Sequence, residues 1–220
     1  MTPALSVSRH HRASGDPEPP DQPAGGIVTA LRHCLYNLAG SDWRLLSFCE
    51  ESEETVIDRI GRIEICRTPP GWFAQTNVTG DLNTARGAAL ERLSRYLRGD
   101  DRSGHSVLAV RPVVQQPLAP GRWLVRVGLS AGNDPSTVPA PPDNEVEIVA
   151  LESETVVSFQ VPGRPALMAI AEAESAILKA VSATNWRKAG AVRLRLHCPS
   201  AVVPLMGSFE VAMPVLERAA

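Results

Sequence analysis

Residues 62–66 read Arg-Ile-Glu-Ile-Cys, and residues 145–149 read Glu-Val-Glu-Ile-Val. In both stretches apolar and polar side chains alternate, which is typical of a β-strand with one buried face. The two stretches are 83 residues apart, and the same offset, without a gap, places Gly80 on Gly163. Both segments therefore read strand, turn, strand, glycine. This similarity indicates an internal duplication.

A helix is predicted after each of these segments. Residues 84–97 carry apolar side chains at helical spacing, with Asp81 or Asn83 as the N-cap and Gly99 as the C-terminal stop. Residues 166–182 show the same periodicity in the second half. Two further strands close each half, at residues 106–114 and 122–129 in the first and at 192–198 and 208–215 in the second.

This order predicts an α+β fold made of two ββαββ repeats, residues 56–130 and 144–217. Hairpin-linked strands are mostly antiparallel, and each helix must bury its apolar stripe on a sheet. We therefore expect a strongly twisted antiparallel sheet or open barrel of about eight strands with two packed helices. A groove is expected between the repeats, and small-molecule sites favour such junctions.

The chain before residue 56 is expected to lie outside this domain. Residues 1–26 are rich in proline and glycine and nearly devoid of apolar side chains, which predicts a disordered tail. Residues 27–55 are interpreted as an extra N-terminal helix followed by an acidic linker. The domain itself is expected to span residues 56–217.

Composition excludes several classes of function. The 220 residues hold 22 Lys and Arg against 24 Asp and Glu, a net charge of −2, which argues against a nucleic-acid partner. No long apolar run or secretory h-region occurs, so no membrane association is expected. The four cysteines lie far apart, which favours reduced thiols and a cytoplasmic location. No phosphate-binding glycine loop, HExxH or GxSxG motif is present.

A series of short motifs follows one order along the chain. Ile63-Glu-Ile-Cys-Arg is followed by Trp72-Phe-Ala, and residues 89–100 read Ala-Leu-Glu-Arg-Leu-Ser-Arg-Tyr-Leu-Arg-Gly-Asp. Arg111-Pro-Val comes next, and Glu210-Val lies near the end. In this order the chain resembles the SOUL haem-binding family and, more distantly, the GyrI-like ligand-binding domains. The resemblance covers about residues 56–217.

The resemblance implies that haem or a related tetrapyrrole binds in the groove between the repeats. Some family members carry a histidine in the first strand as a haem ligand, whereas this chain has Cys66 and Arg67 there. Cys66 can ligate iron as a thiolate or pack as a small apolar residue. His105, in the loop after the first helix, is the other potential iron ligand. Arg67 can pair with a propionate or lie exposed.

Other side chains are candidates for contacting the ligand. Trp72, Tyr96 and Trp123 can stack on a flat molecule or belong to the core. His197 alternates with two arginines on one strand, and we expect this polar face to be exposed to solvent. If the face instead lines the groove, Arg193, Arg195 and His197 form an anion-binding patch.

An enzyme is the alternative. A glutamate amid apolar groove walls would have a raised pKa and act as an acid or base, which makes Glu210 the catalytic candidate. His105 or Arg111 would then transfer protons or orient the substrate. The activity would be haem-dependent, or that of a hydrolase, isomerase or cyclase without an organic cofactor. A third possibility is that the groove binds a protein partner.

Overall fold

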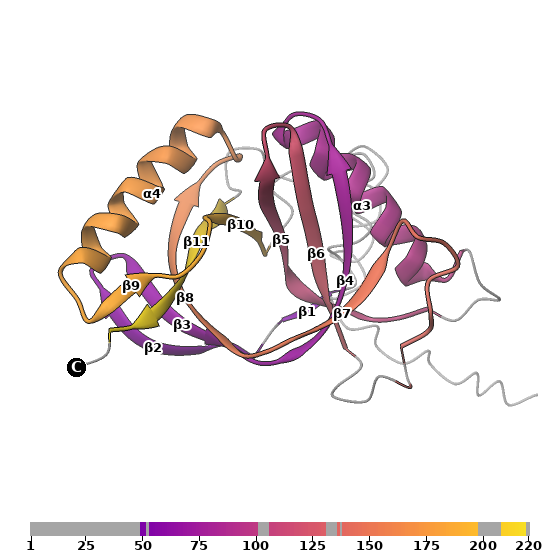
Figure 1. The fold of residues 1–220 in the computed structure, drawn as a ribbon, viewed down its shortest axis with the longest axis horizontal. Helices are drawn as coiled ribbons and strands as arrows, with labels where there is room; N and C mark the ends of the chain where they lie inside the picture. Colours follow the sequence, from indigo (N-terminus) through magenta and orange to yellow (C-terminus); the bar gives the residue numbers. More distant parts are fainter. Residues whose placement is uncertain are drawn as a thin grey trace, which may run out of the picture.

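A computed structural model describes the chain over residues 49–51, 53–100, 106–130, 136, 138–197 and 208–218. The predicted N-terminal tail and helix lie outside these residues. Two helices and eleven strands are described, and the strands form one sheet (Figure 1). The first half holds β1 (Cys49–Glu51), β2 (Thr55–Ile60), β3 (Ile63–Thr68), β4 (Gly71–Thr79), α3 (Leu82–Arg98), β5 (Ala109–Ala119) and β6 (Arg122–Leu129). The second holds β7 (Glu147–Leu151), β8 (Glu154–Pro162), α4 (Leu167–Ser182), β9 (Trp186–Lys188), β10 (Arg193–Leu196) and β11 (Ser208–Glu217).

The sheet is open and almost entirely antiparallel. Its strands follow the order β2-β3-β8-β11-β10-β5-β6-β4-β7, while β9 pairs with β11 and β1 pairs with β5 in parallel. The predicted α+β class with a twisted sheet and two helices is confirmed, but the predicted number of about eight strands is too low. The unexpected strands are β1, β2 and β9, and β1 and β9 are only three residues each.

The first half gives β2 and β3 to the second half's side of the sheet, and the second half gives β7 to the first half's side. β3 pairs with β8, where Ile65 lies opposite Val157, and β4 pairs with β7, where Ala74 lies opposite Ile148. The expected hairpin between β3 and β4 is therefore wrong. Pro69 and Pro70 favour extended backbone, so the chain continues across the molecule instead of reversing. Figure 1 shows β3 leading from one half into β4 of the other.

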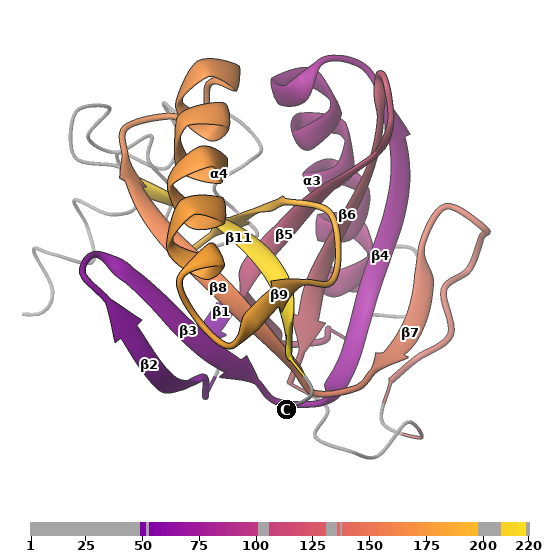
Figure 2. The same cartoon turned by 60° about the vertical axis from the view of Figure 1, so that its left-hand side comes forward.

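The two helices begin and end near the predicted residues. Asp81 is the N-cap of α3, and its carboxylate accepts hydrogen bonds from the backbone N–H groups of Asn83 (2.9 Å) and Thr84 (3.0 Å). Gly99 ends the helix with a positive φ of 72°, a conformation that glycine adopts without strain. α4 begins after Ala166, which makes no side-chain cap hydrogen bond. Figure 2 shows both helices standing over the sheet.

Strand alternation gives the sheet two distinct faces. On the core face, Leu194 of β10 lies opposite both Gln115 of β5 and Val211 of β11. This face is covered by α3 over β4 and β6 and by α4 over β8 and β11, and together they bury one continuous apolar cluster. The opposite face, here called the pocket face, carries Arg195 opposite Val114. A sheet with only one face covered by helices leaves the other free to form a binding site.

The helix α4 provides a direct test of this packing, because Ile177 is fully buried while its neighbour Leu178 is 40% exposed. Ile177→Ala is expected to lower the free energy of unfolding by about 2–4 kcal/mol, since it leaves a cavity under the helix. Leu178→Ala is the matched control and is expected to cost less than about 1 kcal/mol. Urea denaturation measures both. Equal losses would contradict the described orientation of α4.

Candidate ligand-binding site

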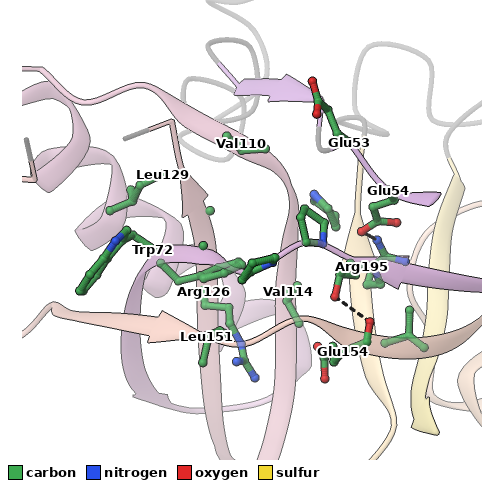
Figure 3. Close-up of a pocket in the computed structure, with 18 of the residues that line it drawn as sticks. Glu53, Glu54, Trp72, Val110, Val114, Arg126, Leu129, Leu151, Glu154 and Arg195 are labelled. Atoms are coloured by element: carbon green, nitrogen blue, oxygen red, sulfur yellow. Dashed lines mark hydrogen bonds and ion pairs between the residues drawn. The ribbon is translucent and has the colours of Figure 1, made fainter. Parts of the chain in front are cut away.

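A cavity of about 400 Å³ lies on the pocket face. It is bordered by β4, β5, β6, β7, β8 and β10, by the connection between β3 and β4, and by residues 53–54 (Figure 3). These segments come from both halves of the chain, so the cavity lies at their junction, as the sequence predicts for the groove. Its apolar walls include Trp72, Phe73, Val110, Pro112, Leu129 and Leu151.

Gly128 brings two of these walls close together. It lies opposite Phe73 on β4 and Val110 on β5. A Cβ atom at Gly128 would lie 3.3 Å from the Cβ of Val110 and 3.6 Å from the ring of Phe73. The missing side chain therefore allows an aromatic and an aliphatic residue to approach each other across β6.

Charged side chains occupy the other end of the cavity (Figure 3). Arg193 is 8% exposed, and its two terminal nitrogens donate to the carboxylate of Glu154 at 2.6 and 2.8 Å. A bidentate pair of this kind matches the geometry of the two groups and compensates part of the cost of burying the cation.

Arg195 is held between two carboxylates. Its guanidinium is 3% exposed, donates to Glu54 and lies 3.0 Å from Glu210. Nε2 of His197 lies 3.1 Å from the same Glu210 carboxylate. Burial raises the pKa of Glu210, but the hydrogen bond from His197 and the charge of Arg195 outweigh it, so the pKa is lowered. Glu210 is thus an ionised partner, not the carboxylate of raised pKa that a catalytic acid requires.

Arg126 differs from the other two arginines. It is 9% exposed and donates to the side-chain oxygen of Gln116 at 2.7 Å, and none of the ion pairs among the described residues involves it. Burial and the nearby charge of Arg193 lower its pKa, whereas the charge of Glu154 opposes this shift. Its Nε has no hydrogen-bond partner among the described residues.

Cys66 lies on β3 opposite Val156, one of the residues that line the cavity, but does not line it itself. Its side chain is buried, and burial together with the charges of Glu54 and Glu64 raises the pKa of the thiol to about 11. The thiolate that iron ligation requires is therefore disfavoured here.

The other predicted site residues are dispersed. Trp72 lines the cavity. Tyr96 is a buried residue of α3 and donates to the carbonyl of Pro139, and Trp123 donates to the carbonyl of Gly80. Arg67 lines a second cavity beside Trp186. His105 and the side chain of Arg111 lie outside the described part of the chain.

Sequence reasoning missed the most informative part of the site. The expected exposure of the strand face bearing Arg193 and Arg195 is wrong, because both side chains are buried and line the cavity. The predicted site residues do not include Arg126. A signal for it was available, since Arg126 is a lone charge within the apolar stretch Trp-Leu-Val-Arg-Val-Gly-Leu, residues 123–129.

The fold and the cavity together define a class of domain: an open antiparallel sheet with two helices on one face and a pocket on the other. The family model described as SOUL heme-binding protein matches residues 49–196. The chain therefore belongs to the SOUL haem-binding protein family. No curated protein matches the chain significantly.

Several solved structures are similar to this chain at low sequence identity. The C-terminal domain of EcmrR is similar with a TM-score of 0.56 and 8% identity, over 70% of this chain and 97% of that one. EcmrR bound to DNA gives a TM-score of 0.55 and 8% identity, over 88% of this chain and 65% of that one. A hydrolase from Listeria innocua gives 0.48 and 9%, over 73% and 94%. The EcmrR likenesses show a shared fold alone.

Two features are absent from the described residues. None of their helices is long and apolar enough to cross a membrane. Within the same residues, no group of three or more His, Cys, Asp or Glu side chains is placed to hold a metal ion.

The raised pKa of Cys66 predicts slow alkylation in the folded protein. At pH 8 only about a thousandth of a thiol with a pKa near 11 is ionised, so iodoacetamide is expected to label Cys66 slowly until the chain is unfolded. The folded state favours the protonated thiol, so stability is expected to fall as the pH rises from 9.0 to about 11. Peptide mapping by mass spectrometry measures the labelling. Rapid labelling of folded Cys66 at pH 8 would contradict its described environment.

The pairing of Glu54 with Arg195 predicts a difference between two adjacent glutamates. Glu54→Gln removes one partner of a buried guanidinium and is expected to cost about 1–3 kcal/mol of unfolding free energy, since Glu210 still compensates part of the charge. Glu53→Gln, at an exposed position in the same segment, is expected to change little. Thermal or urea denaturation of both variants decides. Equal effects would show that Glu54 does not compensate the charge of Arg195 as described.

Proposed function

We propose that the cavity binds a flat, mainly apolar small molecule of the tetrapyrrole class, with haem as the ligand named in the family description. The observation that carries this proposal is that the site has an apolar end and a charged end. Trp72 and Leu129 lie at one end, and Arg195 and Glu154 lie at the other (Figure 3). A volume of about 400 Å³ falls within the range usual for small-molecule sites.

The residues that line the cavity fit a tetrapyrrole's ring and side chains better than they fit its iron. Aromatic and aliphatic walls suit a planar macrocycle, and buried guanidinium groups suit its carboxylates. Among the described lining residues there is no His, Cys, Met or Tyr to act as an axial ligand. We therefore propose binding through the macrocycle and its carboxylates. His105 stays a prediction as an iron ligand.

The enzyme alternative receives no support from Glu210, which is tied to Arg195 and His197. A protein partner for the groove and a cytoplasmic location without nucleic-acid or membrane binding remain proposals based on the sequence.

A haem titration of the full chain tests the proposed function. We expect a saturable change in the Soret band and quenching of tryptophan fluorescence. Trp72→Ala is expected to weaken binding at least about tenfold, because the aromatic wall is lost. Trp186→Ala is the matched control: Trp186 is half-buried beside the second cavity, and its loss is expected to change affinity less than about twofold.

Two results would overturn the proposal. One is the absence of saturable haem binding. The other is a loss of affinity in Trp186→Ala but not in Trp72→Ala, which would place the ligand in the second cavity. Melting curves of both variants show whether each has kept its fold.

A further inference from the structure

The geometry points to Arg126 as an anion subsite within the cavity, which takes a carboxylate carried by an otherwise apolar ligand. This inference rests on the proposed function for the location of the ligand, and it adds the sign of the ligand's charge. It does not require the ligand to be a tetrapyrrole.

The first argument is the cost of burying Arg126. A guanidinium cannot lose its proton near neutral pH, so a buried one must be compensated by an anion or a set of hydrogen-bond acceptors. Arg126 is 9% exposed, yet the described residues give it one neutral acceptor, Gln116, at 2.7 Å. An uncompensated buried cation destabilises a protein, and such a cost is retained at positions that bind a ligand.

The second argument is that the neighbouring carboxylates are already engaged. Glu154 is held by both terminal nitrogens of Arg193, and Glu54 is held by Arg195. Glu154 lies near enough to affect Arg126 electrostatically, but its two oxygens accept from Arg193. The third carboxylate at the cavity, Glu53, is exposed to solvent.

The third argument is that two of the arginines at the cavity have hydrogen-bond donors without an acceptor. The Nε of Arg126 and the Nε of Arg193 are both buried, and neither has a hydrogen-bond partner among the described residues. Both side chains line the cavity, and their charges interact. A carboxylate that approached the guanidinium of Arg126 from the cavity would compensate its charge without breaking an existing ion pair.

The same arrangement disfavours a cationic ligand. Of the three arginines that line the cavity, Arg193 and Arg195 are held in ion pairs, whereas Arg126 has no ion pair among the described residues. A ligand cation would meet the charge of Arg126 at low local dielectric, where repulsion is strong. We therefore expect the cavity to distinguish ligands of equal shape by the sign of their charge.

Pyrenebutyrate, its methyl ester and pyrenebutylamine test this inference, since they share a flat apolar body and differ in charge. The full chain is expected to bind the carboxylate at least about tenfold more tightly than the ester or the amine, measured by pyrene fluorescence and tryptophan quenching. In Arg126→Met the carboxylate and ester affinities are expected to agree within about twofold, with ester binding unchanged. Arg126→Lys is expected to restore part of the preference.

Two controls separate charge from folding. Arg122→Met removes an exposed arginine from the same strand and is expected to retain the full preference. The melting temperature of Arg126→Met is expected to equal or exceed that of the wild type, because the variant no longer buries a cation. Pyrenebutyrate is expected to raise the melting temperature of the wild type more than that of the variant.

The outcomes distinguish this inference from the proposed function. Equal binding of all three probes, no pyrenebutyrate binding, or a carboxylate preference that persists in Arg126→Met would overturn the anion subsite. Equally strong binding of haem and haem dimethyl ester would overturn the subsite and the proposed role of the ligand's carboxylates, and would leave the proposed binding of the macrocycle intact. A carboxylate preference without haem binding would support the subsite and contradict the tetrapyrrole.

Discussion

The exchange of β3 and β7 between the two halves of the sheet is the constraint on which the rest of the structure depends. Because β3 pairs with β8 and β7 pairs with β4, neither half contains all of its own strands, and the halves cannot be pulled apart without breaking both ladders. β10 and β5 join the halves at the centre. The cavity at this junction is therefore built from segments far apart in sequence, and its shape is fixed by the pairing of the whole sheet.

The pocket face also depends on charge pairing. Arg193 and Arg195 point away from the helices and are nevertheless buried, which is tolerable because Glu154 and Glu54 accept their hydrogen bonds. Buried ion pairs contribute little net stability, since desolvation offsets most of the attraction. Their effect is to fix positions: Glu54 holds residues 53–54 over the cavity, and the sheet keeps a polar interior without helices on that face.

The sequence predicts local structure here better than it predicts partners. The alternating pattern predicts the strands β3 and β4, and the capping residues Asp81 and Gly99 predict the ends of α3. These predictions succeed because each signal lies within the element that it predicts or directly beside it. The residues that pair with β3 are 86–96 positions away along the chain, and an alternating pattern does not specify which strand it meets. The same limit explains the error at Arg195, since a polar strand face reads as exposed until the distant segment that covers it is known. The duplication stays a prediction. The offset of 83 residues places Ile65 on Ile148 and Ala74 on Val157, and it therefore relates the strand pair Ile65–Val157 to the strand pair Ala74–Ile148.

The selectivity of the cavity for the charge of its ligand depends on which arginine has no carboxylate partner. A ligand carboxylate that approached Arg193 or Arg195 would compete with Glu154 or Glu54, and the gain would be offset by the ion pair it breaks. At Arg126 no such exchange is needed, because Gln116 is a neutral acceptor on one nitrogen only. The apolar walls supply attraction that any flat molecule can share, whereas this single guanidinium separates ligands by charge. A cavity of this design tolerates variation in the shape of its ligand more readily than a change in the sign of its charge.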